Sequence, residues 1–263
     1  MSLPSEIYDS EYFLSEYCEG WDQFKDGKGL SPLKAFELEL LETGPGISVL
    51  DVGCGRGELL LACTEQGVSE IAGIDYSQAA VDISRETLAG VPGADIRQGL
   101  VTDLPWPDDS FDRIAFCDVI EHIDPDEVAK AFLEFRRVLK PGGKLVVHTA
   151  PNLLWLKYSW PVLRVALKAT GRSESVERMD YWISESKRFH VNEQTVFAMR
   201  RSGREAGFSD VKAWIGSNVT RSGEHHLTKE LTGGTAMTLG VKLAGTRPLR
   251  TFLGNDLYLT ASA

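Results

Sequence analysis

The chain has 263 residues, of which 43% are hydrophobic, and it carries a formal net charge of −10 at pH 7. This length supports one large or two modest cores. The acidic balance argues against a sequence-independent grip on nucleic acid, which needs a basic face. No charge-free run reaches the roughly 18 residues of a membrane span, and the N-terminus lacks the basic flank and apolar stretch of a secretory signal. We therefore expect a soluble, cytoplasmic globular protein.

Cysteine spacing and one histidine pair bear on metal binding. There are four cysteines, Cys18, Cys54, Cys63 and Cys117. Their spacing contains no CxxC pair, so it indicates neither a zinc site nor a disulfide framework. His225 and His226 are adjacent and have no cysteine nearby, which makes them poor zinc ligands. We therefore expect no metal site.

The N-terminal part of the chain differs in composition from the rest. Residues 8–24 are acidic and aromatic with partial helical character, and residues 33–42 show a short amphipathic helical pattern. We expect an N-terminal helical cap over residues 1–44, followed by one main domain over residues 45–263. Aromatic residues recur in the cap at helical spacing; they are Tyr8, Tyr12, Phe13, Tyr17 and Trp21.

Short apolar runs alternate with helical patterns between residues 47 and 149. Runs rich in Val, Ile and Phe predict strands at 47–53, 70–76, 111–119 and 144–150. Amphipathic patterns between them predict helices at 57–67, 77–90 and 124–143. Asp124 is placed to cap the third helix, and the run Pro141-Gly142-Gly143 to end it. This alternation implies a parallel, doubly wound α/β sheet with right-handed crossovers.

The second half of the chain interrupts the alternation and then resumes it. Asn192 is expected to cap a helix that ends at Gly207, and two final strands are predicted at 208–216 and 255–263. Two segments, at about 151–189 and 216–254, are expected to be substrate-side insertions.

The first insertion contains an apolar stretch with interspersed basic residues, at 152–172. Three roles stay open for it. It could form a lid or pocket wall, contact a membrane surface through 153–170, or pair subunits into a homodimer.

The stretch "VLDVGCGRGELL", residues 49–60, contains three closely spaced glycines after an apolar run. At a strand-to-helix turn, glycines let a ligand lie against the main chain, close to the helix N-terminus. A dinucleotide fingerprint would require glycine at position 58, which is Glu58. Asp75 ends the next strand pattern at roughly the 20-residue interval at which a carboxylate bonds ribose hydroxyls. These features favour a nucleoside ligand and disfavour a dinucleotide.

Four ordered motifs carry a family resemblance. They read "LDVGCGRG", "GIDYS", "LPWPDDSFDRIAFCDVIEHI" and "EFRRVLKPGGKLVV". In these motifs the chain resembles the class I S-adenosylmethionine-dependent methyltransferases. The resemblance implies a Rossmann-like, doubly wound, seven-stranded mixed sheet whose last strand is antiparallel. It also implies S-adenosylmethionine as cofactor, with S-adenosylhomocysteine as product.

The resemblance assigns cofactor contacts to the glycine motif and the second strand. Gly53 and Gly55 would lie against the methionine moiety, with Cys54 contributing main chain at the same turn. Asp51 would lie near the amino group of that moiety. Asp75 would hold the ribose hydroxyls.

Further cofactor contacts are expected around the adenine and the methionine side. Tyr76 would lie along the adenine, and Cys117 and Asp118 would border the methionine side. Many relatives carry an aspartate where this chain has Leu100, so we expect an apolar contact from Leu100 and main-chain recognition by Val101.

Methyl transfer from a sulfonium needs alignment, and it needs a base only when the acceptor loses a proton. The family pattern places His122 at the pocket mouth, where it is the first candidate base, and His190 is a second candidate at the acceptor site. His148 is expected to be structural. The N-terminal segment of this family often closes over the cofactor, so Tyr12 is expected at the site.

The activity expected from this resemblance is in-line O-methylation of a small-molecule acceptor that is hydrophobic or glycosylated. Two alternatives stay open. They are N- or C-methylation of a lipid-like acceptor, and a non-catalytic S-adenosylmethionine-binding module.

Overall fold

The computed structural model describes residues 3–216 and 250–263. Seven strands form one sheet with the order β3-β2-β1-β4-β5-β7-β6. Strand β7 is antiparallel to both of its neighbours, β5 and β6, and the other pairs are parallel. This confirms the predicted fold. The strands are β1 Ser48–Val52, β2 Glu70–Asp75, β3 Asp95–Gln98, β4 Phe111–Cys117, β5 Leu139–Thr149, β6 Ser209–Ile215 and β7 Leu257–Ser262.

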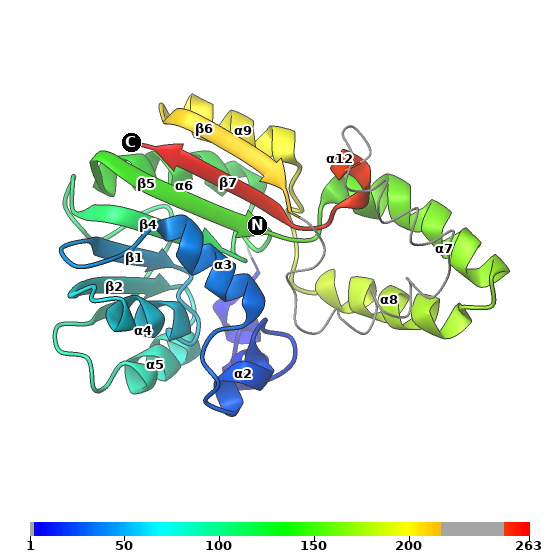
Figure 1. Cartoon of the computed structure of the whole chain (residues 1–263), viewed down its shortest axis with the longest axis horizontal. Helices are drawn as coiled ribbons and strands as arrows, with labels where there is room; N and C mark the ends of the chain where they lie inside the picture. Colours follow the sequence, from blue (N-terminus) through cyan, green and yellow to red (C-terminus); the bar gives the residue numbers. More distant parts are fainter. Residues whose placement is uncertain (1–2, 217–249) are drawn as a thin grey trace.

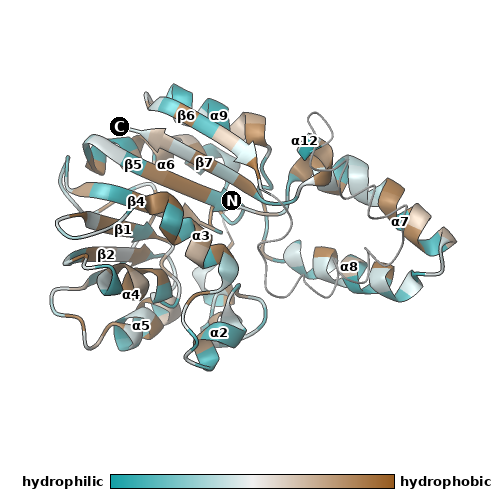
Figure 2. Ribbon diagram, viewed as in Figure 1, coloured by the Kyte–Doolittle hydropathy of each residue, from teal (hydrophilic) through white to brown (hydrophobic). Residues whose placement is uncertain are grey.

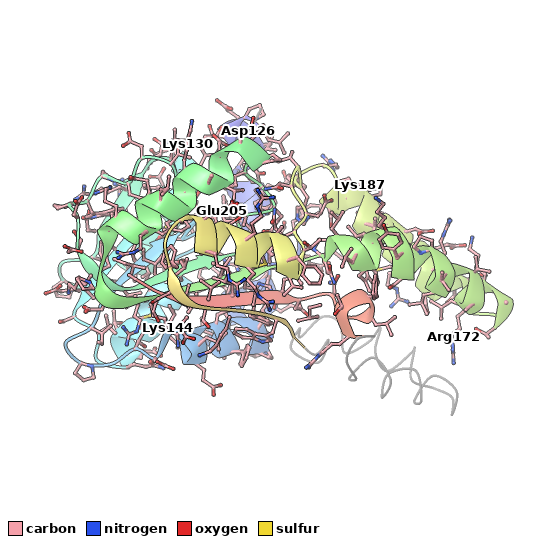
Figure 3. The ribbon with its side chains drawn as sticks, turned by 90° about the horizontal axis from the view of Figure 1, so that it is seen from above. Asp126, Lys130, Lys144, Arg172, Lys187 and Glu205 are labelled. Carbon is pink, nitrogen blue, oxygen red and sulfur yellow. The ribbon has the colours of Figure 1, made fainter. Side chains whose placement is uncertain are left out.

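Helices cover both faces of the sheet (Figure 1). One face carries α3 Pro32–Leu41, α4 Glu58–Glu65 and α5 Gln78–Thr87, and the other carries α6 Pro125–Val138 and α9 Val196–Glu205. Figure 3 shows Asp126 and Lys130 of α6 and Glu205 of α9 pointing outward from the second face. Every residue of β1 is buried, as expected for a central parallel strand covered on both sides.

Helix α6 begins as the sequence predicts and ends earlier. Asp124 and Glu127 form a complete capping box at its start, which satisfies the first free amides of the helix. The helix ends at Val138 and not at the run from Pro141. The reason is that Leu139 is already extended and fully buried, and it pairs with Phe111 in the sheet.

The predicted start of α9 is wrong. Its N-cap is Thr195, whose Oγ1 accepts a hydrogen bond from the Ala198 amide at 3.1 Å. The side chain of Asn192 instead donates to the carbonyl of Ile120 at 3.2 Å. Asn192 therefore anchors the segment before α9 to the loop after β4, which brings His190 toward the sheet edge.

Residues 155–186 form a helical arm that extends from the sheet (Figures 1 and 2). It consists of a π-helical turn, η2 Trp155–Ser159, then α7 Trp160–Ala169 and α8 Ser173–Ser186. Arg172 lies at its tip, and Lys187 lies where α8 returns to the main body (Figure 3). A small core of its own, Trp155, Trp160, Leu167 and Val176, holds the two helices together.

The outer surface of α7 leaves Val162 and Val165 about 70% exposed, so membrane contact or subunit pairing through this stretch stays a prediction. No helix within residues 3–216 and 250–263 is long and apolar enough to cross a membrane.

The N-terminal residues form short helical elements, in agreement with the partial helical character predicted for them. They are η1 Ser5–Ile7, α1 Ser10–Phe13 and α2 Trp21–Lys25. We keep the name N-terminal cap for residues 1–44, and its boundary as a domain stays a prediction. Of the second expected insertion, only a short helix, α12 Arg250–Leu253, lies within the described residues. His225 and His226 lie outside them.

Substitution of Gly57 tests how closely the glycine loop packs against α5. Gly57 has a φ of 75°, and a Cβ there would lie 2.5 Å from Oγ of Ser84, which is buried on α5. Gly57→Ala is therefore expected to lower the free energy of unfolding by about 1–3 kcal/mol, measured by urea denaturation.

Gly90→Ala is the matched control. No atom lies within 4 Å of a Cβ at this position, so its free energy of unfolding should stay within about 0.5 kcal/mol of the parent. Equal stability of the two variants would contradict the packing described for Gly57.

Candidate active site

A cavity of about 600 Å³ opens at the carboxyl ends of the central parallel strands. Its volume is typical of a small-molecule site. The glycine loop (residues 53–57), the loop after β4, the N-terminal cap and the end of α8 all contribute walls. The predicted site residues that line it are Tyr12, Gly53, Cys54, Gly55, Asp75, Tyr76, Leu100, Val101, Cys117, Asp118, His122 and His190.

The glycine loop folds back onto the end of β2. The amides of Gly53 and Cys54 both donate to the carbonyl of Ile74, at 2.7 and 3.1 Å. A Cβ on Gly53, which has a φ of 78°, would lie 2.2 Å from Cγ2 of Val119. The loop therefore presents bare main chain to the cavity and fits against the loop after β4 without room for a side chain.

Asp75 joins the glycine loop to β2. Its Oδ2 accepts from the Gly55 amide at 3.0 Å, and its Oδ1 accepts from the Ser77 amide at 2.9 Å. Burial raises the pKa of Asp75 to about 6, against the opposing effect of these amide donors. Each carboxylate oxygen accepts further hydrogen bonds when ionised, so the group is an acceptor pair directed at the cavity.

Asp51 is the predicted cofactor residue that does not line the cavity. It is buried on β1, behind the lining residues. Burial raises its pKa to about 8, with Lys34 acting against the shift and Glu37 adding to it. Any contact it makes with a ligand stays a prediction.

The expected adenine side is formed by Tyr76, Leu100 and Val101. The Tyr76 hydroxyl donates to the carbonyl of Leu3 at 2.9 Å, so this side chain also fixes the start of the N-terminal cap. Leu100 is 49% exposed, which places a large apolar side chain at the rim of the cavity.

Arg56 ties the N-terminal cap to the glycine loop. It is 4% exposed, and its guanidinium donates to both carboxylate oxygens of Glu58. It also donates to the carbonyls of Phe13 and Glu19 in the cap. A buried guanidinium that is hydrogen-bonded in this way fixes the positions of its partners, because each of its N–H donors has a set direction.

His122 is held by the cap and by the segment before α9. Its Nδ1 lies 3.1 Å from the carbonyl oxygen of Phe189 and 3.1 Å from the hydroxyl of Tyr8. A carbonyl only accepts, so this contact places a proton on Nδ1 and leaves a lone pair on Nε2. Burial lowers the pKa of His122 to about 4. The ring of His190 lies edge-on, with the centroids 4.8 Å apart.

Glu121, beside His122, is also part of the cavity wall. Its Oε2 accepts from Oγ1 of Thr149 at 2.8 Å. Burial raises its pKa to about 8, and the charge of Asp118 adds to the shift.

His148 is buried among three carboxyl groups, in agreement with the structural role expected for it. Its Nδ1 lies 2.9 Å from Asp118 and 3.1 Å from Glu37, and its Nε2 lies 3.5 Å from Asp256. The pKa of His148 is raised well above its usual range because these carboxylates outweigh the effect of burial. The imidazolium thus positions Asp118 at the cavity wall.

The apolar stretch 152–172 does not line the cavity, so the role of pocket wall, one of the three left open for it, is wrong. The end of α8 takes that place through Trp182 and Glu185, followed by Phe189. The arm turns away from the site before α8 returns to it, and no sequence period indicates where such a hairpin turns.

Several lining residues were not predicted from the sequence. They include Lys34, Arg56, Glu121, Trp182 and Phe189. Glu121 and Arg56 carried a signal, since Glu121 directly precedes His122 and Arg56 lies within the glycine motif; the others reach the site through tertiary contacts.

Comparison with known proteins decides the family. The model of a family described as "Methyltransferase domain" matches residues 50–147. The ubiquinone/menaquinone biosynthesis C-methyltransferase UbiE of Bordetella avium is 31% identical over 182 residues, which cover 64% of this chain and 68% of that protein. The chain is a class I S-adenosylmethionine-dependent methyltransferase.

Two further proteins are similar to this chain. An uncharacterized 37.1 kDa protein in transposon Tn4556 of Streptomyces fradiae is 35% identical over 148 residues, and the match spans 55% of this chain and 42% of that protein. The crystal structure of geranyl diphosphate C-methyltransferase from Streptomyces coelicolor A3(2) superposes with a TM-score of 0.58 at 17% identity. That superposition covers 87% of this chain and 77% of that one and shows a shared fold.

Asp75 yields a pH prediction for the methyltransferase. Its raised pKa of about 6 means that it favours the folded state most below its usual value of 3.8, and this contribution is lost as pH rises through about 6. Binding of S-adenosylhomocysteine should do the opposite and tighten over the same range, because only the carboxylate accepts from both ribose hydroxyls. Calorimetric titration across this range measures the binding.

Asp75→Asn is expected to remove the pH dependence and weaken binding about 10–100-fold, the effect of a charge-assisted hydrogen bond. Ser77→Ala, at a neighbouring buried position, is a control for local packing and should keep the pH dependence. Parent-like affinity of Asp75→Asn would contradict the ribose role.

Arg56→Met tests the attachment of the cap. Removing the guanidinium leaves Glu58 buried without this partner, so the free energy of unfolding should fall by about 3–5 kcal/mol. Limited proteolysis should then cut faster between Phe13 and Lys25. Arg201→Met, on the exposed surface of α9, should leave both readouts unchanged. An unchanged cleavage pattern in Arg56→Met would show that the cap is held by other contacts.

Proposed function

We propose that the enzyme transfers the methyl group of S-adenosylmethionine to a hydroxyl oxygen of an apolar small molecule. The observation that carries this proposal is the fixed imidazole of His122 in the cavity wall, with its Nδ1 held by the Phe189 carbonyl and the Tyr8 hydroxyl. An imidazole whose second nitrogen is left with a lone pair is suited to accept a hydrogen bond, and then a proton, from an acceptor hydroxyl.

The glycine loop and Asp75 fit the cofactor. The main chain at Gly53 and Gly55 offers a surface without side chains for the methionine moiety, and the ionised Asp75 offers two acceptor oxygens for the ribose hydroxyls. In this proposal Tyr76, Leu100 and the main chain of Val101 hold the adenine.

The side chains at the expected methionine side of the cavity suit a cationic ligand. Asp118 lines the cavity, and Asp51 is a buried carboxyl group on β1. Aromatic rings, including Tyr12, face the same space, and such rings attract cations. The cofactor, when bound, supplies a methyl group that the sulfonium already activates; the chain's own groups align the acceptor and receive its proton.

The acceptor end is largely aromatic. Tyr8, Tyr12, Tyr17 and Phe189 form a cluster of mutually contacting rings at the cavity wall. Trp182 of α8 contacts this cluster through Tyr17. These surfaces favour an apolar or aromatic acceptor, whose polar atom would reach the pair His122 and His190.

C-methylation is the second candidate, and the name of the UbiE relative, a C-methyltransferase, favours it. Removing a proton from a phenolic hydroxyl activates both the oxygen and the ring carbon beside it. One acceptor, a prenylated hydroquinone, therefore distinguishes the two reactions.

The test incubates the enzyme with this hydroquinone under reducing conditions and with isotopically labelled S-adenosylmethionine. Nuclear magnetic resonance of the product then separates an O-methyl ether, which supports the proposal, from a C-methyl ring, which supports the alternative. Tight binding of S-adenosylhomocysteine with no transfer to any member of a phenol and alcohol panel would point to a non-catalytic module.

His122→Gln is expected to lower kcat about 10²–10⁴-fold, the usual contribution of a positioned proton acceptor. Affinity for S-adenosylhomocysteine should stay within about twofold, since the ribose and methionine contacts lie elsewhere. Val162→Gln, on the exposed surface of α7, is a control for nonspecific effects and should keep the parent kcat. Undiminished turnover of His122→Gln would exclude His122 from the reaction.

A further inference from the structure

Glu121, His122 and His190 bring one metal-ligating atom each to within 4.8 Å of one another. All three line the cavity. They come from two segments, the loop after β4 and the residues before α9. We propose that this cluster binds one divalent transition-metal ion, of which Zn²⁺ is the representative case, at the acceptor end of the cavity.

The donor set matches what such ions prefer. Two imidazoles and one carboxylate are the protein ligands of many catalytic zinc sites, and they leave a coordination position open for water or substrate. The same set binds other first-row divalent ions. Donor atoms around a tetrahedral zinc lie roughly 3.3 Å apart, from the zinc–nitrogen distance. The cluster therefore reaches that geometry through small side-chain movements.

Supporting contacts fix the orientation of two of the three ligands. The Phe189 carbonyl contacts Nδ1 of His122 and leaves Nε2 for a metal, and Thr149 donates to Oε2 of Glu121 at 2.8 Å. Metal-binding histidines and carboxylates are commonly held in this way, by a carbonyl or hydroxyl on the atom that faces away from the metal.

The backbone joins the two segments that carry the ligands. The amides of Val191 and Asn192 donate to the carbonyl oxygen of Glu121, at 2.9 and 3.1 Å. The Asn192 side chain adds its bond to Ile120. His190 is thus held beside Glu121 and His122 by main-chain contacts that do not involve any ligand atom.

Charge supports a cation at this position. Glu121 is 2% exposed, and a buried carboxylate is costly unless an opposite charge lies close to it. The imidazolium of His148 belongs to a neighbouring cluster, Glu37, Asp118 and His148, whose ion pairs are already as short as 2.9 Å. Because the donor atoms of that cluster already contact one another, we assign the metal to Glu121, His122 and His190.

The role of the ion rests on the proposed function. An acceptor hydroxyl that binds the open position loses its proton more readily, because the cation stabilises the oxyanion. The proton leaves to solvent, the oxygen lone pair forms the O–CH₃ bond, and the CH₃–S bond breaks with its electron pair kept by sulfur as S-adenosylhomocysteine. In the metal-bound enzyme His122 is thus a ligand, and the metal replaces it in activating the hydroxyl.

Metal titration of the full-length enzyme tests binding without any acceptor. Chelator-treated protein saturated with S-adenosylhomocysteine is titrated with Zn²⁺ by calorimetry, and with Co²⁺ by visible absorption, whose ligand-field bands report imidazole coordination. We expect one ion per chain. Glu121→Gln, His122→Gln and His190→Gln should each weaken binding by about 100-fold or more, since loss of a supporting partner alone costs about 10–100-fold.

Glu185→Gln is the matched control, because Glu185 lines the same cavity outside the cluster and should keep the parent affinity. Retained S-adenosylhomocysteine binding in each variant shows that it is folded. The proposal is overturned if Zn²⁺ and Co²⁺ do not bind stoichiometrically, or if the three variants bind them as the parent does. It is also overturned if His148→Gln alone abolishes binding.

Activity then separates the two proposals. Methyl transfer to a hydroxyl that persists in chelator, by a protein that binds no ion, leaves the proposed function intact and rejects the metal. One bound ion in a protein that methylates none of the phenol and alcohol panel supports the metal site and rejects the function.

Discussion

The structure depends on how it accommodates buried carboxyl groups beside a cavity. Asp51, Asp75 and Glu121 are all less than a tenth exposed, within a short distance of the carboxyl ends of the central strands. Carboxylates in such positions are stable only with hydrogen bonds or opposite charges. Main-chain amides supply this for Asp75, and the His148 imidazolium supplies it for the wall residue Asp118. The carboxyl groups at the cavity wall also supply the oxygen atoms on which the proposed sulfonium and divalent-cation sites rest.

The N-terminal cap belongs to this arrangement. Arg56 leaves the glycine loop to pair with Glu58 and to hold two carbonyls of the cap. Tyr8 of the cap in turn contacts His122. The glycine loop, the N-terminal cap and the acceptor end of the cavity are therefore connected through side chains whose hydrogen bonds have defined directions.

Much of the expected cofactor end of the cavity could be predicted, because its residues stand at fixed positions relative to the ends of neighbouring strands. A glycine loop after β1 and an acid at the end of β2 meet at the same sheet edge whenever those strands are neighbours and parallel. The residues of the acceptor end have no such fixed relation to the strand ends. Glu121 and His190 are distant in sequence, and their approach follows from Asn192 binding Ile120 where a helix cap was expected.

Periodic burial and local loop chemistry act over a few residues, so the sequence by itself predicted an α/β sheet and the strand-end positions of Gly53 and Asp75. The seven strands and the family followed from the resemblance of its four motifs. Tertiary structure alone decided which side chains converge on the acceptor. Arg56, Phe189 and His190 meet their partners through contacts between segments far apart in the chain, and no local propensity encodes those distances. The base of the helical arm is fixed in the same way, because the side chains of Asn152 and Ser159 donate to carbonyls of the α12 segment.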